Sequence, residues 1–130
     1  MKANELMIGD WVNVTAAENI VRPDVFSLLP KKGKIVGIDG DCIYVDFVEH
    51  PFMFGDIEPI PLTPEILKKN GFKDCQYYAE LLYGEWQILC DCAHLAMRNS
   101  AGWSVDIPCG FIHDLQHALR LCGIEKEVVL

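Results

Sequence analysis

The chain has 130 residues, of which 51% are hydrophobic and 23% are charged, and its formal net charge is −8. This composition excludes a disordered chain and suits one compact domain or two small lobes. The acidic excess argues against binding to the nucleic-acid phosphate backbone, which needs a basic face, and no apolar run has the length of a transmembrane helix.

The first elements are expected to be β-strands. A strand is predicted at residues 11–14, opened by a turn, and residues 15–33 are interpreted as a long loop with a helical turn near 25–29. Two β-rich runs within residues 34–48 flank Asp39-Gly40-Asp41. This spacing predicts a hairpin, because the central residues of the favoured turn need positive φ. Three aromatic residues lie on either side of Pro51 after the hairpin and are expected in a loop, namely Phe47, Phe52 and Phe54.

A helix is predicted after a proline-rich connector at residues 56–62, which suits only an edge strand or an extended link. Thr63 is a good N-cap residue and Pro64 suits the first helical position. Gly71 then permits the left-handed conformation that ends many helices, with Phe72 folding back on Leu67. The predicted helix therefore starts at Thr63-Pro64 and stops at Gly71.

The second half is expected to hold antiparallel strands and a closing helix. The predicted strands cover residues 77–82, 85–97 and 103–107, and the helix covers residues 111–122, followed by a tail that can form a short strand. We prefer a strand to a helix across residues 88–97, because this stretch lacks an N-cap and lies between hairpin-like turns.

These elements predict an α+β fold. Residues 1–62 are expected to form a small SH3-like β-barrel lobe, and residues 63–130 an antiparallel sheet with two helices, the whole being one compact unit.

The residues His113-Asp114-Leu115-Gln116-His117 are the first candidate for chemistry. They approach the His-Glu-x-x-His motif, in which two histidines hold zinc and the glutamate activates water. Aspartate is shorter than glutamate, and the motif needs a third protein ligand. A helical wheel also places His113 and His117 away from the apolar face. An exposed face with two histidines is the preferred interpretation, and a metal-dependent hydrolase is the alternative.

The second candidate is the group Cys90, Cys92 and His94. On one continuous strand these side chains share a face, and sulfur with imidazole suits zinc or iron. Their spacing along a strand strains a shared tetrahedral site, so buried thiols are preferred to metal ligands. A nucleophilic pair of Cys109 with His113 has proximity in sequence but no defined base or orienting group.

Two further groups are weighed in the same way. Phe52, Met53 and Phe54 form an apolar patch suited to a protein partner if they are exposed, although burial is preferred. The acidic stretch at the hairpin lacks the spacing of a calcium-binding loop and is interpreted as solvated charge. That stretch comprises Asp39, Asp41, Asp46 and Glu49.

No secretory signal is expected, because Asn4, Glu5 and Asp10 interrupt the apolar run that such a signal needs. We therefore expect a cytoplasmic protein. In that compartment the six cysteines are expected to be reduced and to act mainly as small hydrophobic side chains.

Three segments carry a resemblance to a known family: Glu5 to Val12, Asp56 to Phe72 and Ile112 to Ile124. In these segments the chain resembles a family of small uncharacterised proteins from gut bacteria of the Bacteroides type, found in prophages and other mobile elements. The resemblance implies a barrel-like start with an α+β remainder and no established activity. It also implies variation at the positions of Asp114 and His117.

The expected function is a noncatalytic accessory module that binds a protein partner, with no cofactor. The alternatives are the metal-dependent hydrolase and weak nucleic-acid binding through the barrel lobe. The last alternative requires the basic residues to converge in space, namely the lysines within residues 31–34 together with Lys68, Lys69 and Lys73.

Overall fold

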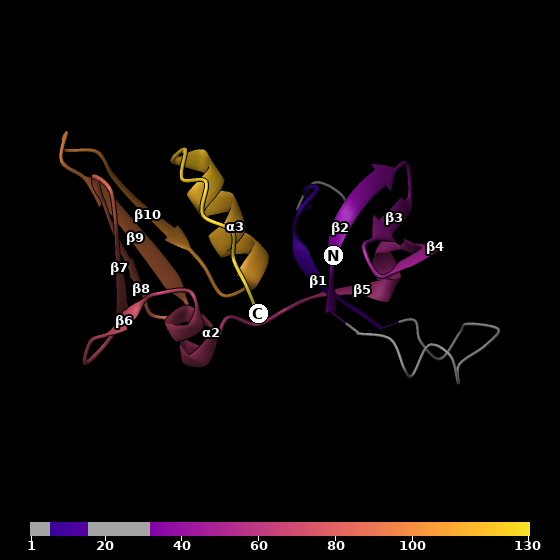
Figure 1. The fold of residues 1–130 in the computed structure, drawn as a ribbon, viewed down its shortest axis with the longest axis horizontal. Coiled ribbons are helices and arrows are strands. Elements are labelled where there is room, and N and C mark those ends of the chain that lie inside the picture. Colours follow the sequence, from indigo (N-terminus) through magenta and orange to yellow (C-terminus); the bar gives the residue numbers. More distant parts are fainter. Residues whose placement is uncertain (1–5, 16–31) are drawn as a thin grey trace. The chain divides into compact units, whose positions relative to one another are not determined.

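The computed structural model describes residues 6–15 and 32–130. In that part of the chain, ten strands form two five-stranded antiparallel sheets, accompanied by two α-helices and a 3-10 helix (Figure 1). The chain divides into two compact units, Met1–Ile60 and Pro61–Leu130. The predicted α+β class is confirmed, and the division falls within two residues of the boundary expected from the sequence. Neither α-helix is long and apolar enough to cross a bilayer.

The first unit contains one sheet in the order β4-β3-β2-β1-β5. A 3-10 helix, η3 (Phe54–Asp56), connects the last two strands of this unit along the chain. The strands are β1 (Trp11–Val14), β2 (Lys32–Asp39), β3 (Cys42–Val45), β4 (Val48–Met53) and β5 (Ile57–Pro59).

The strand at 11–14 and the hairpin are confirmed, with Gly40 at φ 58° in the turn between β2 and β3. The proline-rich link supplies β5, an edge strand paired with β1, as the sequence allowed. Two predictions were wrong. The strand β2 begins at Lys32, inside the expected loop, and β4 occupies the expected aromatic loop. Pro51 is tolerated there because β4 is an edge strand, where a missing N–H breaks no ladder. The expected helical turn near 25–29 lies outside the described residues.

Alternate side chains of this sheet form the core of the first unit. Burying eight apolar side chains is the main stabilising contribution, at roughly 1.5–3 kcal/mol for each large one. The core residues are Leu6, Val12, Val14, Ile35, Ile43, Val45, Phe52 and Ile57.

The second unit contains the other sheet, in the order β10-β9-β8-β7-β6, and both α-helices. Its strands are β6 (Lys73–Asp74), β7 (Ala79–Tyr83), β8 (Trp86–Cys90), β9 (His94–Asn99) and β10 (Ser104–Pro108). Its helices are α2 (Pro64–Lys69) and α3 (Ile112–Leu121), and α3 lies against one face of this sheet (Figure 1).

The strand predicted across residues 85–97 is two strands. Its strand character is confirmed, but β8 ends at Cys90 and β9 begins at His94, with a reversal between them. The side chain of Asp91 causes the reversal, because its Oδ1 accepts hydrogen bonds from the backbone N–H groups of Ala93 (2.9 Å) and His94 (2.7 Å). Aspartate commonly forms such turns. The short strand β6 was not predicted, and no strand is assigned to the tail after α3.

The predicted ends of α2 are confirmed. Thr63 Oγ1 accepts a hydrogen bond from the Ile66 N–H at 3.3 Å, which is the expected N-cap. Gly71 adopts φ 90°, and the N–H of Phe72 donates to the carbonyl of Leu67 at 3.0 Å. This geometry is that of a left-handed C-cap. The helix predicted at 111–122 is likewise confirmed as α3, followed by Gly123 at φ 71°.

A buried amide ties the tail to the end of α2. Asn70 Nδ2 donates to the carbonyls of Ile66 and Val129, both at 2.8 Å, and Asn70 Oδ1 accepts from the Val129 N–H at 2.7 Å. The Asn70 side chain is therefore bonded on both its donor and acceptor sides. Beside it, exposed Lys69 Nζ donates to the carbonyl of Leu130 at 2.7 Å.

We predict that Asn70→Ala lowers the free energy of unfolding by about 2–3 kcal/mol, because it removes three hydrogen bonds from partly buried groups. Asn70→Asp keeps the acceptor but sets a carboxylate oxygen against the carbonyls of Ile66 and Val129, so it should cost at least as much. Urea unfolding measures both changes. Lys69→Ala is the control, since its bond to the same tail is exposed. A cost for Asn70→Ala no greater than for Lys69→Ala contradicts the assignment.

Candidate functional site

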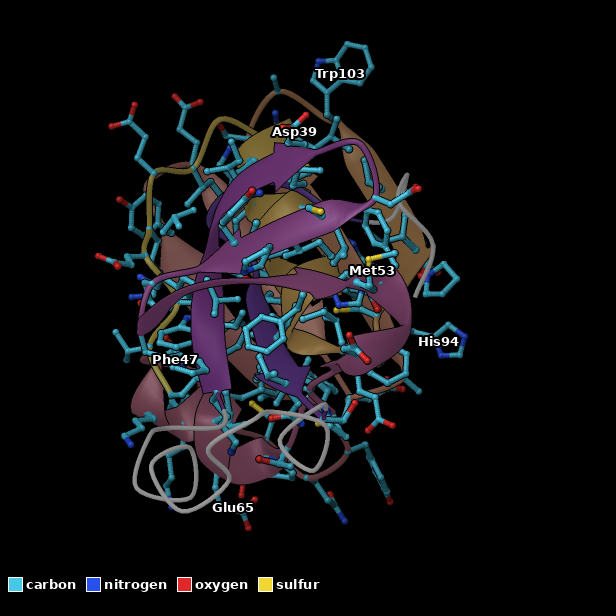
Figure 2. The ribbon with its side chains drawn as sticks, turned by 90° about the vertical axis from the view of Figure 1, so that its right-hand side faces the viewer. Asp39, Phe47, Met53, Glu65, His94 and Trp103 are labelled. Carbon is cyan, nitrogen blue, oxygen red and sulfur yellow. The ribbon has the colours of Figure 1, made fainter. Side chains whose placement is uncertain are left out.

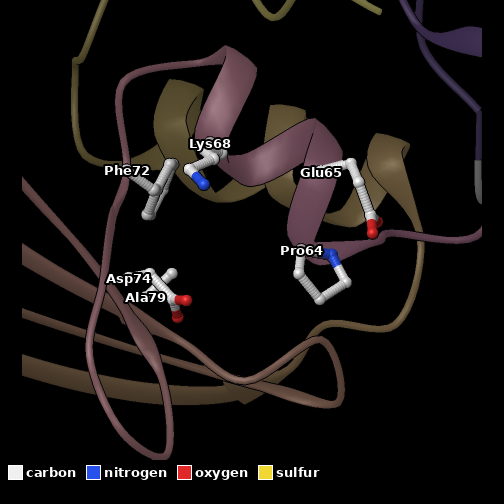
Figure 3. A pocket seen from close by; sticks show the side chains of 6 residues that line it. All are labelled: Pro64, Glu65, Lys68, Phe72, Asp74 and Ala79. Atoms are coloured by element: carbon white, nitrogen blue, oxygen red, sulfur yellow. The ribbon is translucent and has the colours of Figure 1, made fainter.

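Two adjoining pockets lie beside α2 in the second unit, and we call them together the α2 groove. One has a volume of about 180 Å³ and is lined by Pro64, Glu65, Lys68, Phe72, Asp74 and Ala79 (Figure 3). The other has a volume of about 170 Å³ and shares Pro64, Asp74 and Ala79 with the first. Its remaining walls are Leu67, the segment 75–78 and the turn 90–92. The groove thus runs between α2 and the strands β6 and β7.

Two tyrosines stand at the rim of the α2 groove. Tyr77 is 80% exposed and Tyr78 is 42% exposed, and both line the second pocket. Their loop is closed by reciprocal backbone hydrogen bonds between Cys75 and Tyr78, at 2.8 and 3.3 Å. The aromatic rings are therefore displayed from a defined turn. Exposed aromatic side chains beside a pocket are typical of recognition sites.

The charged residues that line the α2 groove are mainly acidic. Glu65, Asp74 and Asp91 contribute three carboxylates, and Lys68 contributes one ammonium group. In Figure 3, the Lys68 and Asp74 side chains come from opposite walls of the first pocket. Backbone hydrogen bonds from His94 and then Ala93 lower the pKa of Asp91, so this carboxylate is held in its charged form.

Cys90 and Cys92 line the second pocket, and Cys109 is a neighbour of Cys90. Cys90 and Cys109 are buried and hydrogen-bonded to each other, and Cys92 is partly buried in the turn between β8 and β9. The N–H of Cys109 donates to the carbonyl of Ala93 at 2.8 Å, which ties the end of β10 to this turn. Cys92 adopts φ 69°, a conformation that non-glycine residues rarely take.

The hydrogen bond between Cys90 and Cys109, together with burial, shifts the pKa values of these thiols in different directions. Donation from Cys109, followed by the N–H of Cys92, lowers the pKa of Cys90 against the effect of its burial. Donating that hydrogen bond, together with burial, raises the pKa of Cys109. Burial also raises the pKa of Cys92. Of these three thiols, Cys90 has the environment that best stabilises a thiolate.

The group Cys90, Cys92 and His94 is not assembled as the sequence predicted. Because the chain reverses at Asp91, His94 starts a new strand, and its imidazole is exposed while the next residue, Leu95, is buried. Figure 2 shows the His94 side chain extending away from the ribbon. Sequence reasoning instead missed two neighbours of Cys90: Cys109, which bonds it, and Cys75, which lines the same pocket.

The histidines of α3 differ from the helical-wheel prediction. His113 is only 6% exposed, so the prediction that it faces solvent was wrong. Its ring stacks on Phe111 at a centroid distance of 5.9 Å and meets the His117 ring edge-on at 5.5 Å. These ring contacts cover a side chain that the wheel counts only as polar. His113 Nε2 also lies 3.5 Å from Asp114 Oδ1.

Asp114 has a structural task in α3. Its Oδ2 accepts hydrogen bonds from the backbone N–H groups of Gly110 (3.3 Å) and Phe111 (3.2 Å), at the start of the helix. A carboxylate at this position satisfies N–H groups that the helix leaves free. Within residues 6–15 and 32–130, no group of three or more His, Cys, Asp or Glu side chains is arranged to hold a metal ion.

The remaining candidates are dispersed. Phe52 is buried and Phe54 is partly buried against the core, so only Met53 of the proposed apolar patch is well exposed. Lys34 lies 5.0 Å over the Trp11 ring and Lys69 bonds to Leu130, so two of the lysines have partners inside their own units. The predicted pair of Cys109 with His113 is not formed as such, because the Cys109 thiol bonds to Cys90.

The acidic hairpin also has structural contacts. Asp46 Oδ1 accepts a hydrogen bond from the Lys34 N–H at 3.0 Å, which helps to hold β2 beside the end of β3. Asp39 and Asp41 are exposed at the turn, as expected for solvated charge. The Glu49 side chain lies outside the described part of the structure.

Comparison with models of protein families, with curated proteins and with solved structures finds no match to this chain. We therefore infer its function from the groove, its charges and its exposed tyrosines.

We predict that the charge of Asp91 makes the stability of the second unit depend on acidity. Because the pKa of Asp91 is lower when folded, its stabilisation is present above the ordinary value of 3.8 and is lost as the pH falls through the folded value. The difference in unfolding free energy between the natural protein and Asp91→Asn should thus shrink below about pH 4. Urea unfolding across this range measures it, and a constant difference contradicts the prediction.

We predict that Asp114→Ala lowers the free energy of unfolding by about 1 kcal/mol, as expected for the loss of a helix-capping side chain. Asp114→Asn keeps an acceptor and should cost less. Metal analysis of the same purified proteins tests the hydrolase alternative. Stoichiometric zinc that is lost on His117→Ala or Asp114→Asn, without a change in stability, would show that these residues are ligands and catalysts instead.

Proposed function

We propose that this protein is a noncatalytic interaction module that binds a short segment of a partner protein in the α2 groove. The observation that carries the proposal is the pair of exposed tyrosines, Tyr77 and Tyr78, at the rim of a groove inside a compact unit. Tyrosine offers a large contact area with little loss of conformational freedom, which suits it to binding surfaces.

The partner segment is expected to combine a basic residue with an apolar one. Glu65, Asp74 and Asp91 give the groove an acidic balance against Lys68, so a lysine or arginine of the partner finds complementary charge. The faces of Tyr77 and Tyr78 can also attract a cation. The apolar residue of the partner is expected to fill the pocket beside Pro64 and Leu67.

We also propose that the first unit is an SH3-like barrel lobe. The strand order β4-β3-β2-β1-β5, with η3 between β4 and β5, supports this finer description. The resemblance of three chain segments to prophage and mobile-element proteins supports an accessory role in such an element, exercised in the cytoplasm. Neither lobe is proposed to bind nucleic acid, because the net charge is −8.

A library of random peptides displayed on phage tests the proposed function. We expect the full-length protein to select peptides that contain lysine or arginine next to an apolar residue, with an affinity that falls as salt rises. Tyr77→Ala and Asp74→Asn should each weaken binding of a selected peptide by about tenfold, which corresponds to ~1.4 kcal/mol. Fluorescence anisotropy with the labelled peptide measures these affinities.

Trp103→Ala is the matched control. Trp103 is also an exposed aromatic residue of the second unit, at 71%, but it lies in the turn before β10 and does not line the groove (Figure 2). Its substitution should leave the affinity unchanged. The proposal is overturned if no peptide is selected, if the selected peptides lack basic residues, or if Trp103→Ala weakens binding as much as Tyr77→Ala.

A further inference from the structure

Two buried thiols of the second unit are direct neighbours. Cys90 ends β8 and Cys109 follows β10, and each is at most 1% exposed. Their sulfur atoms are joined by a hydrogen bond, and both cysteines are free thiols. The backbone bond from Cys109 to Ala93 keeps the two chain segments together. The two thiols are therefore next to each other in the folded chain.

The surroundings of Cys90 favour reaction at its sulfur. The S–H of Cys109 and the N–H of Cys92 are the two donors that face it. Two donors stabilise a thiolate, which is the nucleophilic form of cysteine. Asp91 acts in the opposite sense through its negative charge, and so does burial.

The second pocket of the α2 groove borders on Cys90, which is itself only 1% exposed. Cys90 and Cys92 both belong to the wall of the second pocket of the α2 groove, whose volume is about 170 Å³. One molecule of liquid water occupies roughly 30 Å³, so hydrogen peroxide fits easily, whereas a protein thiol or a folded oxidoreductase does not. Because Cys90 is almost fully buried, only an oxidant of this size can approach it from the pocket.

We propose that Cys90 and Cys109 form an oxidation site for hydrogen peroxide, at which the two thiols become a disulfide. The Cys90 thiolate attacks one peroxide oxygen and the O–O bond breaks. This gives a sulfenic acid on Cys90 and a hydroxide ion, which takes up a proton to become water. The Cys109 sulfur then attacks the Cys90 sulfur, the S–O bond breaks, and a second water leaves. Two electrons pass from the two sulfurs to the peroxide, and two thiols become one disulfide.

The remaining thiols are set apart from this reaction by position. Cys122 donates its S–H to the Met97 sulfur at 3.6 Å, and Cys42 lies in β3 of the first unit. Cys75 and Cys92 line the same pocket as Cys90 and are the competitors for the oxidant. The site goes beyond the proposed function, because the disulfide forms without any partner.

Peroxide treatment of the reduced full-length protein tests the site. Alkylation of the remaining thiols, followed by intact mass measurement, should show four modified cysteines out of six, and all six again after treatment with dithiothreitol. Digestion with trypsin should link the peptide 74–98 to the peptide 99–120. Cleavage before Asp91 and after Glu80 or Glu85 then places Cys75, Cys90 and Cys92 on separate fragments and shows which of them is linked to Cys109.

Variants make the order of events visible. Cys109→Ser should stop at the sulfenic acid, which dimedone traps on Cys90, and Cys90→Ser should abolish the cross-link. Cys122→Ser and Cys75→Ser are the matched controls and should retain it. The proposal is overturned if Cys109 pairs with Cys75 or Cys92 in the natural protein. It is also overturned if peroxide modifies the thiols singly without a cross-link, or if peroxide leaves all six thiols free. These measurements use the unsubstituted chain, so they stand even where a variant folds poorly.

Discussion

The carboxylate of Asp91 determines the geometry of the second unit around the groove. By accepting two backbone hydrogen bonds, it reverses the chain after Cys90 and starts β9 at His94. The reversal keeps the Cys90 sulfur inside and turns the His94 imidazole outward. The turn also contains Ala93, whose backbone carbonyl accepts a hydrogen bond from the N–H of Cys109. One wall of the second pocket and the position of Cys90 beside Cys109 both involve this turn.

Most of α2 could be predicted because its signals are local. Thr63 and Gly71 each act through neighbours within four residues, so the sequence itself contains both ends of the helix. The same holds for the hairpin at Gly40. The break between β8 and β9 could not be seen in this way, because the left-handed residue there is Cys92 rather than glycine or asparagine. The strand β4 was hidden by Pro51, which indicates a loop unless the strand is known to lie at an edge.

The candidate site was harder to predict because its parts come from distant segments. Cys109 and Cys75 stand alone in the sequence, and only the pairing of the strands brings them near Cys90. The burial of His113 was missed for another reason: its ring is covered by the neighbouring rings of Phe111 and His117, whereas a helical wheel counts histidine only by its polarity. Cysteine and histidine are ambiguous in this respect, since each occurs both in cores and at reactive sites.

The edge strand β10 has a consequence for the behaviour of the protein in concentrated solution. Asp106 is exposed at its centre, and exposed Pro108 ends it. Antiparallel pairing with the same strand of another molecule brings like charges together and meets a residue that has no N–H to donate. With a net charge of −8, the chain also repels its own copies. This edge of the β-rich second unit is thereby protected against growth into aggregates.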